Sequence, residues 1–224
     1  MRAPISVIIP TLNAEKHLGS CLASLMPALE AGLIRELIVS DGGSSDETVA
    51  MAKEWGANVI EGTASRGAQL ARGCRAAEGL WLLVLHADTR LQDGWVGPAV
   101  RHLGSEKAGW FRLAFDDGGV AGALVASWAN MRSGFGLPYG DQGLLVPADL
   151  YDAVGGYPSQ PLMEDVALAM ALKGHLKPID ATAFTSASRY KRQGWLRRGA
   201  RNLWTLFRYF FGASPQRLAD SYRT

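Results

Sequence analysis

The sequence predicts an α/β protein with a mostly parallel, Rossmann-like sheet and helices on both faces. Short apolar runs alternate with segments of helical period through the first half of the chain. Of the 224 residues, 48% are hydrophobic and 20% are charged, which is enough apolar material for a large buried core. Polar residues follow several of the apolar runs, at the strand ends where open α/β sheets bind their ligands.

Four strands are expected in the first half, and the fourth is apolar on both faces, as in a covered parallel sheet. They are residues 5–10, 35–40, 58–60 and 81–87. The first intervening helix carries leucines at intervals of three or four, at positions 18, 22, 25 and 29. The second begins at a capping-box spacing, Ser44 to Glu47, and ends near Gly56. The third spans residues 65–77, with Gly79 as its C-cap.

The second half is less regular. We expect strands at 109–115 and 143–147, a helix over 164–173 that Gly174 ends, and an amphipathic helix from about 195 to 211. No linker or repeat interrupts the chain. The organisation is therefore one domain over residues 1–188, with a basic helical extension of the same domain over 189–224.

The extension carries nine Lys or Arg residues and one acid, whereas residues 1–188 carry 14 basic and 20 acidic side chains. A basic segment on an acidic body indicates contact with phosphates or anionic lipid, or a solvated helix face. Its arginines alternate with apolar residues, which fits an interfacial membrane helix. It fits equally a helix packed on the domain, with arginines reaching a phosphate group. Nucleic-acid binding is not expected, because no recognition motif is present.

Several function classes are excluded by motif. The chain has no phosphate-binding GxxxxGK[ST] loop, no GxGxxG after the first strand, no GxSxG and no HExxH. The two cysteines, Cys21 and Cys74, exclude a disulfide scaffold and a cysteine-based zinc site, and they fit a reducing compartment. No secretory signal or spanning segment is recognised, so we expect a cytoplasmic protein that is either soluble or peripheral to a membrane.

Three expected strands end in polar residues. PTLNAE follows the first, DGGS the second, and His86-Ala87-Asp88-Thr89 completes the fourth. Each alone is ordinary turn chemistry. Together, on one edge of one sheet, they indicate a nucleotide-type ligand.

The ordered pieces SVIIPTLNAE, VSDGGSSDET, HADT, GDQG and MED resemble the family 2 inverting glycosyltransferases over roughly residues 4–175. The segments HADT, GDQGLLV and SRYKRQGW resemble those of a small bacterial branch of this family. That branch is related to enzymes found in radical-SAM and arsenosugar-type clusters. The resemblance implies a GT-A fold and a nucleoside-diphosphate sugar donor, with UDP the usual carrier.

Carried over position by position, the resemblance implies a set of donor-binding residues. Asp41 would bond the base, commonly uracil N3–H, and the helix start RGAQLAR would approach the nucleotide, since a helix N-terminus suits a phosphate. The implied donor-binding residues are Pro10, Thr11, Asn13, Glu15, Asp41, Gly42, Ser44, Arg66, Gly67, Gln69, His86, Ala87 and Asp88.

Asp88 matches the second carboxylate of the family's DxD motif, and so would be a ligand of Mn²⁺ or Mg²⁺. The sequence departs from that motif at His86, which stands where the first Asp is usual and puts metal affinity in question. Glu164-Asp165 resembles the family's ED motif, in which Asp165 would be the catalytic base and Glu164 its companion. Without the other motifs these two acids would be ordinary helix N-terminal residues.

Asp141 and Gln142 of GDQG would line the acceptor side. Four aromatic residues are candidates for stacking on sugar rings, although burial in the core is the commoner fate of such side chains. They are Trp110, Trp128, Tyr139 and Tyr157.

Two other functions stay open on the sequence. A nucleotidyltransferase shares the layout and the carboxylate–metal chemistry, but it usually carries a Gly-rich basic loop where this chain has PTLNAE. A non-catalytic, membrane-peripheral protein that binds nucleotide sugars would also keep these motifs, and His86 would then mark the loss of catalysis.

Overall fold

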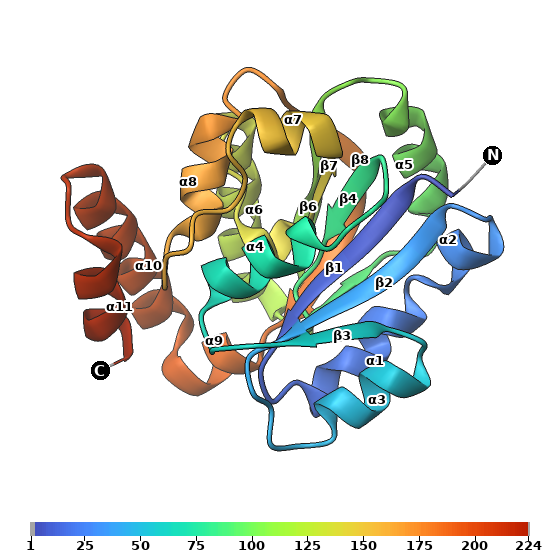
Figure 1. Ribbon diagram of the computed structural model, residues 1–224. Helices are drawn as coiled ribbons and strands as arrows, with labels where there is room; N and C mark the ends of the chain where they lie inside the picture. The colour runs from blue at the N-terminus through green and yellow to red at the C-terminus, as the bar shows by residue number, and fades with distance from the viewer. Residues whose placement is uncertain (1–2, 224) are drawn as a thin grey trace.

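The computed structural model describes residues 3–223 and contains one eight-stranded sheet in the order β3-β2-β1-β4-β7-β6-β8-β5 (Figure 1). The strands of its first half are β1 (Ile5–Thr11), β2 (Ile34–Asp41), β3 (Asn58–Glu61) and β4 (Trp81–Val84). Those of its second half are β5 (Thr89–Leu91), β6 (Ala108–Asp116), β7 (Leu144–Pro147) and β8 (Leu176–Ser186).

The sheet is mostly parallel. Strands β1, β2, β3 and β4 pair in parallel, as do β6 and β8. Strand β7 runs antiparallel to its neighbours β4 and β6, and β5 runs antiparallel to β8. The predicted fold class is therefore confirmed, with two reversed strands in the half that the sequence described less well.

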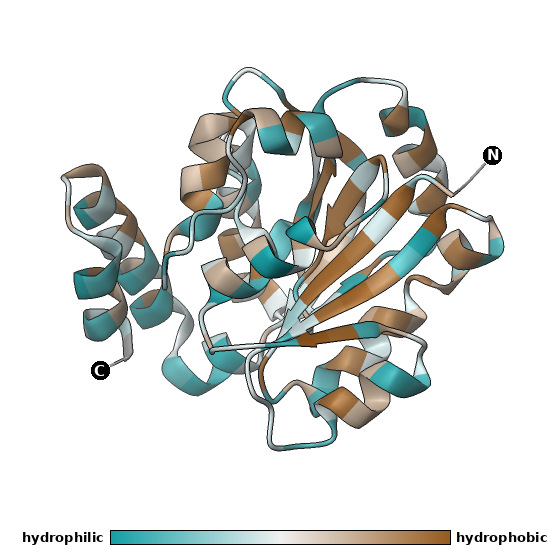
Figure 2. Ribbon diagram, viewed as in Figure 1, coloured by the Kyte–Doolittle hydropathy of each residue, from teal (hydrophilic) through white to brown (hydrophobic). Residues whose placement is uncertain are grey.

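Helices cover both faces, and each set packs on its own apolar cluster. One cluster joins β1 and β4 to α1 (Glu15–Ala23), α2 (Met26–Glu30), α3 (Thr48–Glu54) and α5 (Val96–Leu103). The other joins the opposite face to α4 (Arg66–Arg75), α7 (Ala148–Ala153) and α8 (Glu164–Ala171). Figure 2 shows the strands between them largely in the brown of apolar residues.

The remaining helices belong to the second half of the chain. Helix α6 (Gly119–Gly134) packs on β6, and the 3-10 turn η1 (Gly140–Gln142) leads into β7. The C-terminal segment folds as α9 (Ser188–Gln193), α10 (Trp195–Phe210) and α11 (Pro215–Arg223). Leu218 of α11 lies buried with Met163 and Val166, so the segment is packed against the body of the protein.

Three local predictions were wrong. The leucine-rich helix divides into α1 and α2 around Ser24, and Leu29 is exposed. Helix α3 begins at Thr48, because Ser44 bonds Asp41 and Asn13 instead of capping a helix. Helix α4 ends at Arg75 with Ala76 as its C-cap; Gly79 is needed because a Cβ there would lie 2.6 Å from the Ser6 backbone nitrogen.

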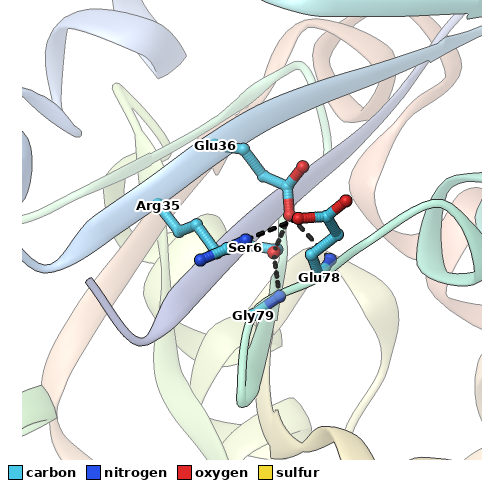
Figure 3. A network of polar contacts seen from close by, with 5 residues as sticks. All are labelled: Ser6, Arg35, Glu36, Glu78 and Gly79. Carbon is cyan, nitrogen blue, oxygen red and sulfur yellow. Dashed lines mark hydrogen bonds and ion pairs between the residues drawn. The ribbon is translucent and has the colours of Figure 1, made fainter. Parts of the chain in front are cut away.

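A polar network joins the starts of β1 and β2 to the loop before β4 (Figure 3). The Ser6 hydroxyl donates to Glu36, and the Glu36 carboxylate also accepts from the Glu78 backbone N–H at 2.7 Å. The Gly79 N–H donates to the Ser6 hydroxyl at 2.8 Å, and Arg35 pairs with Glu78. The network fixes the loop that leads from α4 into β4.

None of the helices within residues 3–223 combines the length and the apolar character that crossing a bilayer requires.

Candidate functional site

A cavity of about 530 Å³ opens beyond the ends of β1 and β4 and beside the first turn of α4. Residues of α9 and α11 close it from the other side. Its walls bring together residues that lie far apart in the sequence. They include Pro10, Thr11, Asn13, Lys16, Arg66, Gln69, His86, Ala87, Asp88, Arg189, Arg192 and Tyr222.

A second cavity, of about 140 Å³, adjoins the first. Six residues line both cavities, namely Arg66, His86, Asp88, Leu162, Arg189 and Tyr222. The smaller cavity adds Asp141, Asp165, Tyr139, Tyr190, Arg198 and Asn202. The two cavities therefore meet at the end of the segment His86-Ala87-Asp88, on either side of Asp88.

Charge is divided unevenly between the two cavities. The larger one is lined by four basic side chains, Lys16, Arg66, Arg189 and Arg192, and by a single carboxylate, Asp88. The smaller one is lined by three carboxylates and three arginines. An anionic ligand is thus favoured in the larger cavity, and carboxylate chemistry is available in the smaller one.

The loops after β1 and β2 are held together by Asp41, which is buried and does not itself line either cavity. Its Oδ1 accepts from Thr11 Oγ1 at 2.7 Å and from Ser44 Oγ at 2.6 Å, and its Oδ2 accepts from the Gly43 and Ser44 N–H groups. Burial opposes ionisation, but these hydrogen bonds outweigh it and hold the pKa of Asp41 below its usual value. Asp41 braces the loops, and its bond to a base stays a prediction.

The neighbouring predicted residues have the same bracing role. The Glu15 carboxylate accepts from the Glu47 N–H, and Asn13 Oδ1 accepts from the Ser45 N–H at 2.9 Å. Gly42 lies against the Gln69 amide. Of this group only Asn13 lines the larger cavity, whereas Glu15, Gly42 and Ser44 lie behind its wall.

Helix α4 begins at the cavity, and its first turn positions Arg66 and Gln69. The buried Gln69 Nε2 donates to the backbone carbonyls of Thr11 and Ser40, which joins α4 to the ends of β1 and β2. Gly67 faces away from the cavity, where a Cβ would lie 2.4 Å from the Pro158 carbonyl. Its lack of a side chain serves the packing of the loop at Pro158, and its contact with a donor stays a prediction.

His86 lies where the cavities meet, packed on the backbone of Gly140. A Cβ at residue 140 would stand 2.5 Å from His86 Nε2, so the GDQG turn needs its first glycine for this approach. Burial and the nearby Arg66 guanidinium lower the pKa of His86 to about 4. The imidazole is therefore neutral at physiological pH. It does not place a second negative charge beside Asp88, as an Asp at position 86 would.

Asp165 is the carboxylate of the ED pair that reaches the smaller cavity. Its Oδ2 accepts from the Gly140 N–H at 3.0 Å and its Oδ1 from the Val166 N–H at 2.8 Å, which fixes the carboxylate beside the GDQG turn. Met163 precedes the pair with a left-handed backbone, φ 65°, and so begins α8 with an abrupt change of direction.

Glu164 points the other way and lines neither cavity. Its side chain is 1% exposed and lies 3.4 Å from Arg66 Nε, and burial raises its pKa to about 7. Asp141 is half-buried, its buried Oδ1 has no hydrogen-bond partner in the structure, and burial raises its pKa to about 6. Glu164 thus supports Arg66. Asp141 and Asp165 are the carboxylates that line the smaller cavity alone, whereas Asp88 lines both cavities.

The structure separates the remaining acceptor-side predictions. Gln142 is fully buried, where its Oε1 accepts from Ser133 Oγ and its Nε2 donates to the Phe111 carbonyl, so it does not face a ligand. Tyr139 lines the smaller cavity, with the Arg132 guanidinium over its ring. Trp110 and Tyr157 are buried, and Trp128 is exposed on α6.

Several lining residues were absent from the predicted set, above all Arg189, Arg192, Arg198 and Tyr222 of the C-terminal segment. The excess of arginine after residue 188 was the available signal. The prediction of a packed helix agrees with the burial of Leu218 against the body, and contact of the arginines with a phosphate stays a prediction. Which of these arginines face the cavities depends on how α9, α10 and α11 pack, and no spacing in the sequence indicates it.

A divalent cation is implied by the DxD resemblance, and the donor set fits one that is shared with a ligand. Within the described residues, no group of three or more His, Cys, Asp or Glu side chains could hold a metal ion. Asp88 is the single carboxylate of the larger cavity. Mg²⁺ in particular is often bound by one or two carboxylates together with substrate phosphates and water, so one carboxylate suffices if a diphosphate supplies further oxygens.

Comparisons with solved structures agree on the fold. Residues covering 82% of this chain superpose on 60% of a crystallised Staphylococcus aureus TarS fragment (residues 1–349), with a TM-score of 0.64 and 18% identity. Glucosyl-3-phosphoglycerate synthase from Mycobacterium tuberculosis, crystallised with Mn²⁺, UDP and glucosyl-3-phosphoglycerate, gives a TM-score of 0.56 at 21% identity. That match covers 80% of this chain and 70% of the synthase.

Sequence comparison finds relatives of the same kind. A PGL/p-HBAD biosynthesis glycosyltransferase of Mycobacterium bovis is 40% identical over 101 residues, which are 42% of this chain and 39% of the relative. The chain therefore matches about two fifths of that relative's length. Residues 6–130 match the family described as Glycosyl transferase family 2. This match spans more than half of the chain, and the chain belongs to glycosyl transferase family 2.

Proposed function

We propose that this protein transfers a sugar from a nucleoside diphosphate to an acceptor hydroxyl, with inversion at the anomeric carbon. The observation that carries the proposal is the pair of adjoining cavities with unequal charge. Four basic side chains around the larger cavity suit a diphosphate, and the carboxylates of the smaller cavity suit a hydroxyl that must lose a proton.

UDP is the expected nucleotide. Both TarS and the M. tuberculosis synthase have been crystallised with UDP, and TarS also with UDP-GlcNAc. We place the nucleoside against Pro10, Thr11 and Asn13, and the diphosphate between the α4 N-terminus and α9. The free N–H groups of a helix N-terminus favour a phosphate there. Arg66, Arg189 and Arg192 then offset the charge of the leaving nucleotide.

In the transfer, the acceptor oxygen attacks the anomeric carbon from the face opposite the diphosphate. The bond from that carbon to the phosphate oxygen breaks, the electron pair leaves with the nucleotide, and Asp165 takes the hydroxyl proton. The Gly140 and Val166 N–H groups hold the Asp165 carboxylate in one orientation for this step. A positioned base of this kind typically contributes about 10²–10⁴-fold to the rate.

Asp88 would hold Mn²⁺ or Mg²⁺ together with the diphosphate, and the cation would supply further neutralisation of the leaving group. The M. tuberculosis synthase was crystallised with Mn²⁺. His86 is neutral and so offers a hydrogen bond or a nitrogen ligand where many relatives have a carboxylate.

Asp141 and Tyr139 are the proposed acceptor contacts. Asp141 has an unpartnered buried oxygen, and both residues line the smaller cavity. We take only the family into this proposal, since nothing in the site singles out the narrower branch of radical-SAM and arsenosugar-type clusters. Both cysteines are free and buried, which fits a reaction in the reducing cytoplasm.

A thermal-shift experiment with UDP, GDP, CDP, TDP, ADP and NAD, with and without Mn²⁺, tests the donor site. A ligand at about 100 times its Kd stabilises the native state by about 2.7 kcal/mol, or about 5–10 °C in Tm for a chain of this size. Arg192→Gln should reduce the shift with UDP, and Arg217→Gln, an exposed arginine of α11 outside both cavities, should leave it unchanged. An unchanged Tm with all six compounds would contradict the proposal.

A further inference from the structure

Helix α10 presents an apolar face to solvent. Leu196, Leu203, Phe207 and Phe210 recur at intervals of three, four or seven residues, which places them along one face. Trp204 is 60% exposed and Phe207 50% exposed, and their rings stack at 5.6 Å between centroids. Phe211, at the end of the helix, packs on Phe207 and is 76% exposed. These side chains, together with Leu196, Leu203 and Phe210, are called the outer face of α10.

Three polar residues in the first half of α10, Arg198, Arg201 and Asn202, contact the protein instead. Arg198 and Arg201 both donate to Gln193 Oε1, and the Arg201 guanidinium lies over the Tyr222 ring. Asn202 bonds the hydroxyls of Tyr190 and Tyr222. A surface helix usually buries its apolar stripe and exposes its polar one. Helix α10 packs Leu206 and Tyr209 on the body in this way, but it also leaves a second apolar stripe in solvent. Exposed aromatic residues in such a group indicate a surface that another body covers.

Helix α6 adds a second apolar face beside the start of α10. Trp195 lies against the first turns of α6, where a Cβ at Gly122 would be 3.0 Å from the indole. The outward residues of α6 carry no charge, and the large ones are Val120, Leu124, Trp128, Met131 and Phe135. The exposed apolar surface of the protein is therefore concentrated on two helices that touch.

Charge indicates what covers the outer face. Residues 189–224 contain nine basic side chains and one acidic one. Arg197 is exposed one position from Leu196, and Arg208 follows Phe207. Apolar and aromatic side chains bordered by arginine suit the boundary between the headgroups and acyl chains of an anionic bilayer. A symmetric contact with a second copy would instead bring the arginines that border the two copies of this face toward one another, where like charges repel.

We propose that the outer face of α10 docks this protein on the surface of a bilayer that contains anionic phospholipid. The inner face of the same helix supplies Arg198 and Asn202 to the smaller cavity. Docking would therefore hold that cavity close to the membrane, beside molecules dissolved in the lipid. The docking surface does not depend on the proposed transfer reaction, because it is defined by exposed side chains outside both cavities.

The test is co-sedimentation of the full chain with two kinds of vesicle, phosphatidylcholine alone and phosphatidylcholine mixed with phosphatidylglycerol. We expect binding to the mixed vesicles that weakens with added salt. Changing Trp204→Ser and Phe207→Ser together should weaken it by at least about tenfold, because two large apolar side chains no longer enter the lipid. Arg197→Gln should weaken it by about fivefold.

The matched control is Trp55→Ser with Leu80→Ser, an exposed aromatic and an exposed aliphatic residue on other parts of the surface. This pair should bind vesicles like the unchanged protein. Circular dichroism and Tm show whether each variant is folded. Quenching by brominated lipid gives a second readout, which should be strong in the unchanged protein and weaker in Trp204→Phe.

Absence of binding to mixed vesicles at low salt would overturn the proposal, as would binding that the Trp204 and Phe207 changes leave intact. A concentration-dependent dimer that those changes dissociate, without vesicle binding, would assign the outer face to a second copy. Nucleotide-induced shifts in Tm are measured separately, so a failure of docking is distinguishable from a failure of the proposed transfer.

Discussion

The guanidinium of Arg66 lies 3.4 Å from the carboxylate of Glu164, and it joins a charge on the cavity wall to one buried behind it. Arg66 is partly exposed, whereas Glu164 is 1% exposed. The ED pair thereby supports Arg66 on the wall of the larger cavity with its first residue and lines the smaller cavity with its second. One short helix start thus contributes to both sides of the site.

Removing the arginine tests this pairing. Arg66→Ala should destabilise the protein, because a buried carboxylate loses its partner, a change that typically costs about 3–5 kcal/mol. The Glu164 carboxyl can take up a proton instead, which removes its charge at pH 5 but not at pH 8. The loss of unfolding free energy in Arg66→Ala should therefore be larger at pH 8 than at pH 5. Urea denaturation at the two pH values measures the difference. Arg75→Ala, at the exposed end of the same helix, is the control, and equal losses in the two variants would contradict the pairing.

Stability should depend on pH through groups of opposite sign, in which Asp141, whose pKa burial raises to about 6, acts in the same sense as Glu164 and against His86. Burial raises the pKa of Glu164 from 4.5 to about 7, so the native state binds its proton more tightly and stability falls as pH rises through this range. Burial lowers the pKa of His86 from 6.5 to about 4, so its contribution is lost as pH falls from 6.5. The two effects oppose one another between about pH 4.5 and 6.5.

Glu164→Gln removes the first effect and leaves the second. The Tm of this variant should rise more steeply with pH between about 4.5 and 6.5 than that of the unchanged protein, and the two profiles should differ by several degrees at their extremes. Glu54→Gln, an exposed residue of α3, should follow the unchanged profile. Parallel profiles for the unchanged protein and Glu164→Gln would show that Glu164 titrates normally.

The sequence was most informative where structure depends on neighbouring residues. Strands β1 and β2 were predicted within one residue of their observed bounds, because a buried parallel strand is a continuous apolar run. Strand β4 was also found from its apolar run, but it ends at Val84, three residues before the predicted end. Strand β5 has three residues, and β8 begins with exposed residues, so neither gives such a run. Both strands were missed.

The same contrast holds in the site. The strand-end motifs identified the region, but whether a side chain faces a ligand or a loop depends on tertiary contacts. Asp41 and Gln142 have polar side chains at motif positions, and both side chains make hydrogen bonds within the protein. Arg189 and Tyr222 line both cavities although no motif includes Tyr222, because helices near the C-terminus fold back over the sheet edge.

Asp165→Asn should lower the rate of sugar transfer by about 10²–10⁴-fold, because the amide cannot take the acceptor proton. The shift in Tm with UDP should remain, since Asp165 does not line the larger cavity. Asp152→Asn, at the exposed surface of α7, is the matched control and should transfer sugar normally. Full activity in Asp165→Asn, measured as UDP release in the presence of acceptor, would require a different base.

His86→Asp should increase dependence on metal. A second carboxylate beside Asp88 strengthens binding of a divalent cation, and we expect the Mn²⁺ concentration that supports half of the UDP-induced shift to fall by about tenfold. Without metal the variant should be less stable, since Asp141 and Asp165 also lie nearby. Asp88→Asn should abolish the effect of Mn²⁺, whereas His175→Asp, which lies outside both cavities, should not change it. An unchanged Mn²⁺ response in His86→Asp would contradict a cation held at Asp88.

Substitutions at Gln142 and at its neighbour Asp141 should have different effects: the first should lower Tm, and the second should lower the rate of transfer. Gln142→Leu removes a fully buried amide and leaves the Tyr139 N–H and the Phe111 carbonyl without this partner. Each unsatisfied group costs about 1–3 kcal/mol, so Tm should fall by several degrees while the UDP-induced shift persists. Asp141→Asn should have little effect on Tm and should slow transfer, because this carboxylate lines the smaller cavity, where we propose that the acceptor binds. If Gln142→Leu instead kept its Tm and lost only transfer, the glutamine would contact the acceptor, as the GDQG resemblance implies.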